Sequence, residues 1–471
     1  MKDKELSFGK VDKDKISQWS NVVSREEPLD LITYGRDASV VRPGEADCVV
    51  CPTNTRQIQD ILSGASDDKI PVYVRGAGTM YAGGVNPHSG GVVVDLASLD
   101  RILEIDLARG LVVVEAGARF GTVMNALKPL KHTLGIVPLT GPTATIGGAV
   151  SSHALGTGSP RSQSMGDCVA GLEVVLPDGT VVRTGSAACK GAGFFQRYCI
   201  GPDLTGLFIG ADATLGIVTK VCLWLYPEPV DKQTFCLGFS NVGDASSFLT
   251  TLQGTELTRN IWYGAGYEAT TIKARISAVT PDVDSSELPN FCFGLELGGH
   301  LDEVRRDKRL ILAAAKTYHG NEFQEFDDAY FRKLRNEETY WYSFAGYFTL
   351  SRCALLMTSL PVDRLENFVE CVKKFRIDWP DFVWGGAVVL CRRGLHGGIV
   401  TFYDESTQWE AVLIAIEQAT KDLLAAGCVP YKSGKIWQGR SDSFPAFQRL
   451  LQMVKRGIDP DNIMSPGNLG L

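Results

Sequence analysis

The chain has 471 residues, of which 44% are hydrophobic and 21% charged, and this composition is typical of a globular protein rather than a disordered or fibrous one. The length allows two or three domains with sizeable cores. A net charge of −7 argues against a dedicated surface for nucleic acid or for an anionic membrane, so we expect no nucleic-acid partner.

The sequence also predicts where the protein is found. The first residues, MKDKELSFGKVDKDK, lack the apolar stretch of a signal peptide, and no run approaches the roughly 18–20 apolar residues of a membrane span. We therefore expect a cytoplasmic protein with no integral membrane segment and with reduced cysteines. Cys48 and Cys51 form a lone C-x-x-C inside an apolar run and are interpreted as core residues.

The first predicted elements are a strand over residues 48–52, a helix over 53–66 and a strand over 70–76. Thr53 or Thr55 is the expected N-cap of the helix. The apolar positions of this helix recur at helical spacing, which predicts a buried face formed by Ile58, Ile61 and Leu62.

The second of these strands runs into a glycine-rich loop, VYVRGAGTMYAGG, at residues 72–84. A Rossmann dinucleotide loop is excluded by the spacing, because Tyr81 stands at the sixth position of G-x-G-x-x-G and no helix follows. The chain instead continues into the apolar run VVVDL, which predicts another strand. The loop therefore connects two strands, and any nucleotide is held in another way.

Further strands are expected around residues 90–96, 101–117 and 171–185, with hairpin turns at 108–110 and 177–179. A helix is predicted over 119–132, and YPEPV at 226–230 is typical of a linker. Beyond it, strands and helices predict an α+β domain with an antiparallel sheet to about residue 425, followed by a helix and a proline-glycine tail.

Three more glycine-rich segments lie downstream, at residues 140–158, 201–221 and 459–471. Small residues at this density allow backbone N–H groups to face a phosphate without side chains in the way. Any one segment is equally well explained as an ordinary turn. Four together, flanked by apolar strands and with few cationic side chains, favour a long cofactor bound by main chain.

These four segments resemble the FAD-binding oxidoreductase family that contains vanillyl-alcohol oxidase, the p-cresol methylhydroxylase (PCMH) flavoprotein, D-lactate dehydrogenases and glycolate oxidase. The resemblance implies an α+β fold: a two-lobed PCMH-type FAD-binding domain over 1–230, an antiparallel-sheet cap domain over 231–425, and a C-terminal segment, 426–471, that returns to the FAD domain. It also implies FAD as the cofactor. Non-covalent binding is expected, because Thr79 and Met80 stand where some members place a flavin-linked histidine, and His88 lies beyond the glycines.

By position in the family's motifs, three groups of residues are expected to contact FAD. The pyrophosphate group comprises Arg75, Gly76, Ala77, Gly78, Thr79, Met80 and Gly83. The ribityl and diphosphate group comprises Pro138, Thr140, Thr145, Gly147, Gly148, Ser151 and Gly156. The adenine-ribose or ring-edge group comprises Thr214, Gly216 and Ile217.

The sequence matches neither known branch of the family in full. The resemblance to the 2-hydroxy-acid branch implies a metal-binding histidine pair in the cap and a Glu-His-Gly near the end of the chain. In this sequence the cap stretch holds only His396, and residues 427–437 read GCVPYKSGKIW. We therefore expect no metal. The resemblance to the phenol-oxidising branch implies a Tyr-Arg pair that anchors a phenolate. Tyr431 and Lys432 stand at this place, and the lysine supplies the charge of the arginine but not its two parallel hydrogen bonds. The aspartate base of that branch is replaced by Leu139.

The candidate catalytic residues are therefore Tyr431, Lys432, Arg352 and His396. Tyr431 and His396 are candidates to take a hydroxyl proton, whereas Lys432 and Arg352 are candidates to hold a carboxylate. For each of them an ordinary structural role, such as a surface ion pair for Arg352, remains the alternative. The aromatic stripe at 340–348 is interpreted as core or as a wall of an apolar substrate pocket.

The resulting prediction is an FAD-dependent oxidoreductase that removes a hydride from a small alcohol-type substrate, first of all a 2-hydroxy acid such as lactate or glycolate. The alternatives are a para-substituted phenol or benzylic alcohol oxidase, a flavin-dependent alkyl-transferring synthase, and an FAD-binding subunit of a larger complex. The expected partners are a small-molecule substrate, a separate electron acceptor (oxygen, a quinone or a redox protein), and either a second copy of the chain or a redox-partner subunit.

Overall fold

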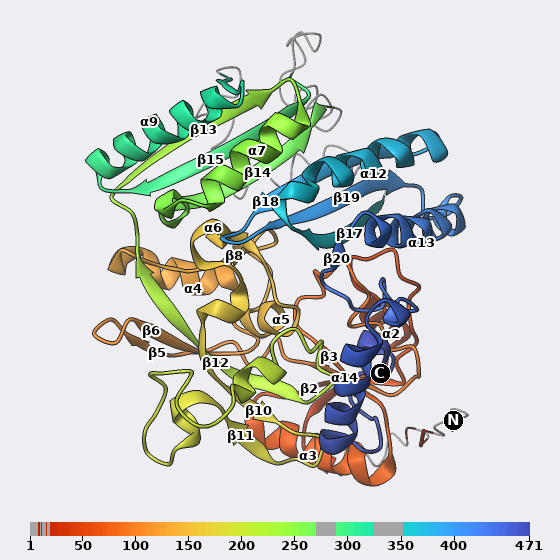
Figure 1. Ribbon diagram of the computed structural model, residues 1–471. Helices are drawn as coiled ribbons and strands as arrows, with labels where there is room; N and C mark the ends of the chain where they lie inside the picture. Colours follow the sequence, from red (N-terminus) through yellow and green to blue (C-terminus); the bar gives the residue numbers. More distant parts are fainter. Residues whose placement is uncertain (1–7, 10, 12–15, 17–18, 270–288, 324–351) are drawn as a thin grey trace.

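The computed structural model describes residues 8, 9, 11, 16, 19–269, 289–323 and 352–471. Two sheet-containing lobes make up the lower half of the molecule in Figure 1, and a larger sheet with its helices lies above them. The aromatic stripe at 340–348 lies outside the described residues.

The first lobe is a four-stranded sheet in the order β1-β2-β4-β3. β2 and β3 both pair in parallel with β4, and β1 pairs antiparallel with β2. The elements of this lobe are β1 (Val23–Arg25), α2 (Pro28–Tyr34), β2 (Cys48–Cys51), α3 (Thr55–Asp68), β3 (Val72–Arg75) and β4 (Val92–Asp95).

The cap of α3 differs from the prediction. Asn54 is the N-cap, and its side chain accepts a hydrogen bond from the Gln57 N–H at 3.0 Å. The predicted Thr53 or Thr55 cap is therefore wrong, and the physical reason is that an asparagine side chain is a better N-cap acceptor than threonine. The predicted buried face is confirmed, because Ile58, Ile61 and Leu62 are fully buried.

The second lobe is an antiparallel six-stranded sheet in the order β11-β10-β12-β6-β5, with β7 paired to β12. Both predicted hairpins are present in it. Its elements are β5 (Ile102–Asp106), β6 (Leu111–Glu115), α4 (Phe120–Leu127), β7 (His132–Leu134), β10 (Val169–Val175), β11 (Val181–Arg183) and β12 (Ile217–Pro227).

Short elements connect the second lobe to the upper part of the molecule. They are β8 (Val137–Pro138), α5 (Ile146–Ser151), β9 (Gly156–Thr157) and α6 (Ser159–Ser162). β8 and β9 pair with each other, and α6 contacts β14 of the upper sheet. The glycine-rich segment 140–158 therefore lies at the junction of the two halves.

The upper part, which we call the cap, is built on an antiparallel eight-stranded sheet in the order β16-β13-β15-β14-β18-β19-β17-β20. The strands are β13 (Asp231–Phe239), β14 (Ile261–Glu268), β15 (Phe291–Gly299), β16 (Asn321–Glu322), β17 (Arg352–Leu360), β18 (Val383–Leu390), β19 (Leu395–Tyr403) and β20 (Val429–Pro430).

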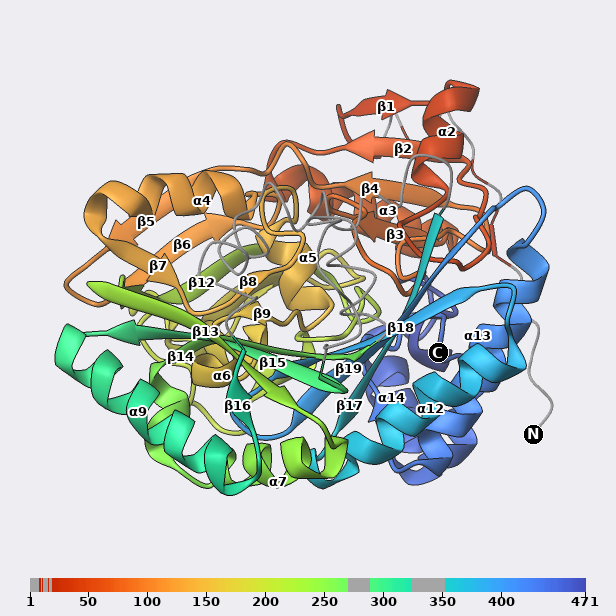
Figure 2. The same ribbon diagram turned by 90° about the horizontal axis from the view of Figure 1, so that it is seen from above.

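Four helices lie along one face of this sheet, as Figure 2 shows from above. They are α7 (Val242–Gln253), α9 (Leu301–Thr317), α12 (Leu365–Asp378) and α13 (Trp409–Ala425). Because successive strand residues point to opposite faces, Ala354 and Leu356 of β17 join the core under these helices, whereas Leu355 and Met357 face the two lower lobes.

The C-terminal segment returns to the first lobe. After α14 (Pro445–Ile458), Met464 forms a parallel bridge with Val72 of β3, and the Ser465 N–H donates to the Val72 carbonyl. One hydrophobic core lies within the two lobes and another within the cap. The predicted mixture of helices and antiparallel sheets is confirmed.

Two further properties of the described residues concern cysteines and membranes. Ten of the twelve cysteines are buried, including Cys48 and Cys51, and all twelve are free thiols; Cys189 and Cys199 are the exposed ones. No described helix has the length and apolar character needed to cross a bilayer.

Candidate active site

A cavity lies where the glycine loop after β3 meets the segment 138–154, and we call it the glycine cavity. Eleven of the residues predicted to contact a cofactor line it. They are Gly76, Ala77, Gly78, Thr79, Met80, Pro138, Thr140, Thr145, Gly147, Gly148 and Ser151.

The main chain of this loop has hydrogen-bond donors to offer. The N–H groups of residues 76–80 donate to no backbone or side-chain acceptor among the described residues. Gly78 adopts φ +65°, and a Cβ at Gly76 would lie 2.2 Å from the Thr145 Oγ1, so larger residues would close the cradle. Unpaired amides in a glycine cradle fit the phosphate oxygens of a nucleotide.

The other predicted cofactor residues lie outside the lining of this cavity. Arg75 lies behind the loop, where its Nη1 donates to the Arg36 carbonyl at 2.6 Å, and the Gly83 N–H donates to the Asp37 carboxylate at 2.9 Å. Thr214 and Ile217 are fully buried, Gly216 forms the entry to β12, and Gly156 lines the neighbouring pocket. From this stretch, Asp212, Ala213 and Val218 line the cavity instead.

Asp212 is the functional candidate that sequence reasoning missed. Its carboxylate accepts a hydrogen bond from the Gly434 N–H at 3.2 Å, and burial raises the pKa of this carboxyl to about 7. The signal was present, because Asp212 is an acidic residue amid the small residues of a segment already identified as cofactor-binding. Its burial against Gly434 could not be inferred from the sequence.

A second pocket, the inner pocket, continues from the glycine cavity into the cap. The two share Thr79, Pro138, Thr140 and Lys432. Three of the four predicted catalytic residues, Tyr431, Lys432 and His396, come together here. Apolar walls surround them, formed by Ala82, Leu139, Leu155, Leu355, Met357, Val389 and Ile436 together with the ring of Tyr81.

Lys432 lies at the border between the glycine cavity and the inner pocket. The residue adopts φ +53°, a conformation that directs it out of the short β20 strand, and its Nζ lies 5.9 Å from the centroid of the Tyr431 ring. Burial lowers the pKa of its ammonium to about 8, and the Asp212 carboxyl opposes this shift. Within the described part of the chain it forms no ion pair, so its charge is available to a ligand.

Tyr431 and His396 form one wall of the inner pocket. Their ring centroids are 4.4 Å apart, and the Tyr431 hydroxyl donates to the His153 carbonyl at 2.8 Å. Burial raises the pKa of Tyr431, so this hydroxyl stays protonated. Burial and the charges of His153 and Lys432 lower the pKa of His396 to about 3, which keeps its imidazole neutral.

The strand register fixes the orientation of His396. Ser359 of β17 lies directly opposite His396 of β19, and the Ser359 Oγ is 2.9 Å from the His396 Nδ1. One ring nitrogen is therefore engaged by the serine, which leaves Nε2 as the nitrogen available to a ligand.

Arg352 is separated from the other three candidates. Its Nη1 lies 2.9 Å from the Glu405 Oε1, and Arg36 pairs with the same carboxylate. It lines neither the glycine cavity nor the inner pocket. The geometry therefore favours a structural ion pair for Arg352.

In the described part of the chain, no three His, Cys, Asp or Glu side chains gather in a way that could hold a metal ion.

Comparisons with known proteins agree with this geometry. Residues 46–185 match a protein family described as FAD binding domain. This part of the chain is an FAD-binding domain. It contains the glycine loop and the 140–158 segment, and FAD is the cofactor, as predicted. The glycine cavity as its binding place stays a prediction. Non-covalent attachment stays a prediction.

Two curated relatives extend the similarity. The chain is 33% identical over 215 residues, 46% of its length, to the glycolate oxidase subunit GlcD of Bacillus subtilis, and 24% identical over 443 residues, 90% of its length, to the mitochondrial D-lactate dehydrogenase [cytochrome] of Arabidopsis thaliana. The aligned parts span 44% of the first relative and 73% of the second. The predicted resemblance to FAD-linked oxidases and dehydrogenases is confirmed.

The fold is also similar to a solved structure, p-cresol methylhydroxylase with substrate bound. The TM-score is 0.82 at 19% sequence identity, and the superposition covers 97% of this chain and 96% of that one. The predicted PCMH-type fold is therefore confirmed.

Proposed function

We propose that this protein is an FAD-dependent oxidoreductase that removes a hydride from the CH–OH carbon of a 2-hydroxy acid. The observation that carries the proposal is the position of Lys432, a half-buried cation without an ion pair in the described part of the chain, at the border of the glycine cavity and beside a neutral histidine. The relatives named as a glycolate oxidase subunit and a D-lactate dehydrogenase act on substrates of this class, which supports it.

Each inner-pocket residue has a part in this proposal. FAD supplies the acceptor for the hydride. The Lys432 ammonium binds the substrate carboxylate, and the apolar walls exclude water from the reacting carbon. Leu355 and Met357, which the cap sheet places opposite the glycine loop, limit the space for the rest of the substrate.

His396 receives the proton of the substrate hydroxyl in this scheme. The charge of Lys432 contributes to the low pKa of His396 in the free protein. A carboxylate bound at Lys432 cancels part of that charge, so the imidazole becomes a better base when substrate is present. Ser359 holds the Nδ1 and thereby directs the Nε2 toward the pocket.

The test is anaerobic mixing of the FAD-loaded protein with D-lactate, glycolate and longer 2-hydroxy acids. Reduction of the flavin is monitored by its absorbance at about 450 nm. We expect bleaching by at least one D-2-hydroxy acid. Absence of bleaching by the whole set, with FAD bound, would reject the proposal.

A second candidate is oxidation of a para-substituted phenol or benzylic alcohol. The apolar walls of the inner pocket and the adjacent Tyr431 and Lys432 favour it, because an aromatic ring with a single anionic oxygen needs one cation and apolar contacts. Bleaching by 4-hydroxybenzyl alcohol and not by 2-hydroxy acids would select this candidate.

The electrons must then leave the protein, and we propose a separate acceptor, either oxygen, a quinone or a redox protein. A cytoplasmic location completes the proposal. Its support is the presence of twelve free thiols, which suit a reducing compartment. Re-oxidation rates of the bleached flavin with oxygen and with a soluble quinone analogue distinguish the acceptors.

A further inference from the structure

A third and larger cavity opens above the inner pocket, between the FAD-binding part and the cap. Its volume is about 1120 Å³, and we call it the outer cavity. It shares Leu155, His396 and Tyr431 with the inner pocket, so the two spaces lie next to each other at these three residues. A side pocket of about 540 Å³ joins it through Gln163, Asp167 and Arg392.

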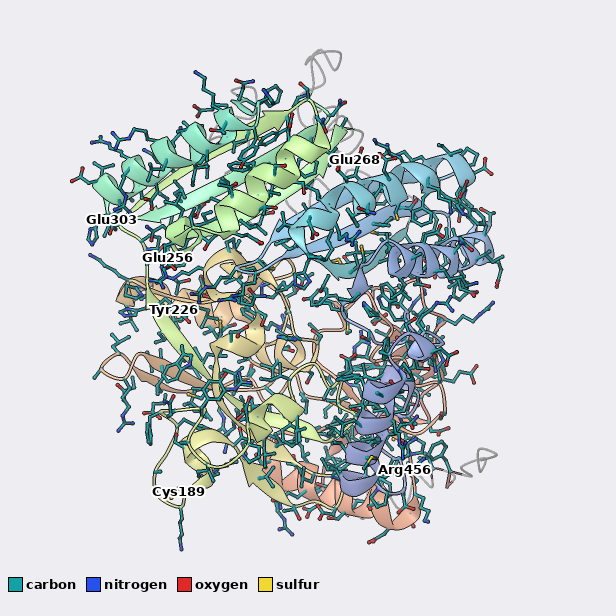
Figure 3. The ribbon with its side chains drawn as sticks, viewed as in Figure 1. Cys189, Tyr226, Glu256, Glu268, Glu303 and Arg456 are labelled. Carbon is teal, nitrogen blue, oxygen red and sulfur yellow. The ribbon has the colours of Figure 1, made fainter. Side chains whose placement is uncertain are left out.

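Arginines line the outer cavity and its side pocket, although the protein as a whole carries a net charge of −7. Four are present, Arg161, Arg259, Arg392 and Arg393, against two carboxylates, Asp167 and Glu256. Figure 3 shows Tyr226, at the end of β12, and Glu256, below α7, on either side of the boundary between the two halves. The positive charge therefore collects at the mouth of the site.

Arg161 is held in place without a carboxylate partner. Its guanidinium carbon lies 5.4 Å from the centroid of the Tyr226 ring and 5.0 Å from that of the Trp262 ring. It is half-buried, and no described residue forms an ion pair with it. Two aromatic faces thus fix a cation that faces an open pocket, which is the arrangement of a prepared anion site.

Arg392 and Arg393 are presented by a rigid turn between β18 and β19. Their backbone N–H groups donate to the Ser159 carbonyl at 3.2 Å and to the Gln163 Oε1 at 3.0 Å. The Gln253 side chain also donates to both ends of the turn, at the Cys391 and Gly394 carbonyls. Neither arginine forms an ion pair within the described part of the chain.

The two carboxylates near these arginines are already engaged. Asp167 accepts the Ser164 hydroxyl at 2.5 Å, and Glu256 pairs with Arg259. Three of the four guanidinium groups, those of Arg161, Arg392 and Arg393, have no ion-pair partner among the described residues and can bind a ligand. A phosphate or carboxylate accepts two hydrogen bonds from a guanidinium, so either group suits this site.

We propose that the outer cavity binds a phosphate or carboxylate group at the far end of a substrate whose reacting carbon lies in the inner pocket. The proposal rests on the proposed function for the identity of that reacting carbon. It extends the substrate class from a small 2-hydroxy acid to an elongated one with anionic groups at both ends, joined by an apolar segment that passes Leu155 and Tyr431.

The first test measures anion binding without flavin chemistry. The FAD-loaded protein is titrated calorimetrically with inorganic pyrophosphate and, separately, with the dicarboxylate succinate. We expect saturable binding of at least one of them that weakens with added KCl, and the preferred anion distinguishes a phosphate from a carboxylate end. Arg161→Gln and the double variant Arg392→Gln/Arg393→Gln are expected to weaken that binding about tenfold or more.

The matched control is the double variant Arg56→Gln/Arg109→Gln. It removes the same charge as the Arg392/Arg393 variant, and its residues lie on α3 and on the β5–β6 turn, away from the cap (Figure 1). It should bind as the unaltered protein does. Failure of both anions to bind the unaltered protein, or equal weakening in the control, would overturn the proposal.

The second test links the site to the substrate. Bleaching rates are compared between a long-chain 2-hydroxy acid and its analogue with a second carboxylate at the far end. The unaltered protein should reduce faster with the dicarboxylate, and Arg161→Gln should remove that preference through KM rather than kcat. A preference that is absent, or unchanged in the variant, contradicts the proposal. Bleaching by neither compound would reject the proposed function, while the anion titration still reports on the outer cavity.

Discussion

Asp212, which is buried, and Lys432, which is half-buried, are groups of opposite charge that line the same cavity, and the loss of solvent around them moves both pKa values toward neutrality. The Asp212 carboxyl has a pKa of about 7 and the Lys432 ammonium one of about 8. Each charge supports the other, because an anion nearby favours the protonated lysine and a cation nearby favours the ionised carboxyl. The charge of the site therefore changes within the physiological pH range.

Lys432→Met removes the cation that we propose binds the substrate carboxylate. We expect KM for a 2-hydroxy acid to rise by about 10- to 100-fold, since a hydrogen bond to a charged group contributes about 1.5–3 kcal/mol. The variant should retain FAD, for which we propose the glycine loop as the main binding segment. Steady-state kinetics measures KM, and the ratio of flavin to protein absorbance measures the FAD content. An unchanged KM would show that Lys432 does not bind the substrate.

The pH profile of kcat/KM follows from the same residue. Lys432 is charged below its pKa, so kcat/KM for an anionic substrate should be constant at lower pH and fall as pH rises through about 8. Asp212→Asn removes the charge that raises the pKa of Lys432, and the fall should then begin at lower pH. A profile that is identical in both proteins would show that the two residues are not coupled.

At the scale of single elements, the loop after β3 depends on glycines for its backbone. Gly78→Ala would place a Cβ at φ +65° and 2.3 Å from the Arg75 guanidinium, so either the loop or Arg75 must shift. We expect a protein that folds but retains less than about half of its FAD. The backbone strain of about 1–2 kcal/mol disfavours the loop conformation, and the shift also moves the amides that would bind the phosphates. The flavin absorbance of the protein after gel filtration measures the FAD that it retains.

The control for this variant is Gly457→Ala on α14. This glycine is exposed within a helix, and a Cβ there meets nothing within 4 Å. FAD content should be unchanged, and the helix should gain slightly in stability. Equal loss of FAD in both variants would indicate a general effect of glycine replacement rather than a requirement of the loop.

The elements themselves could largely be predicted from the sequence. Period-two and helical patterns are local properties, so the β5–β6 and β10–β11 hairpins, α3 and a cap of mixed strands and helices were expected, whereas α12 was not predicted as a helix. The glycine loops were also visible, because a main-chain site needs small residues wherever it is placed. The cap of α3 was missed since three adjacent polar residues, Thr53, Asn54 and Thr55, could each have served.

The site could be predicted only where function constrains short segments. Lys432 and Tyr431 lie in one loop whose position resembles the family's. The pairing of Arg352 with Glu405, 53 residues away, depends on the register of β17 against β19 in the cap sheet, and that of Asp212 with Gly434, 222 residues away, on how the C-terminal segment packs against the lobes. Such long-range pairs carry no local pattern, so the isolated position of Arg352 and the burial of Asp212 required the structure.

At the scale of the whole molecule, a segment of the first lobe is built into the cap. Val40 is 1% exposed and belongs to the cap core, and its carbonyl accepts the Trp409 Nε1 hydrogen at 2.8 Å. Arg42 lies over the Trp409 ring at 5.3 Å. The Val40 segment thus adds to the attachments of the cap made by the chain that leaves β12 and by the contact of α6 with β14.

Val40→Ala should therefore lower the free energy of unfolding by about 1–3 kcal/mol through the loss of buried methyl groups. Val230→Ala is the matched control, because Val230 is 77% exposed in the segment between β12 and β13. Denaturant unfolding followed by tryptophan fluorescence compares them. Equal stability of the two variants would mean that the Val40 contact does not hold the cap.

The return of the C-terminal segment determines when the protein can take up FAD. Asn468 donates hydrogen bonds to the carbonyls of Gly84 and Asp212, and Met464 extends the β3 sheet, so two of the glycine loops are tied together by residues translated almost 400 positions after the first loop. On the ribosome, the nascent chain exposes unpaired amides with nothing to hold the loops in register. We therefore expect cofactor uptake to follow release of this segment from the exit tunnel, so that a ribosome stalled before residue 464 carries a colourless nascent chain.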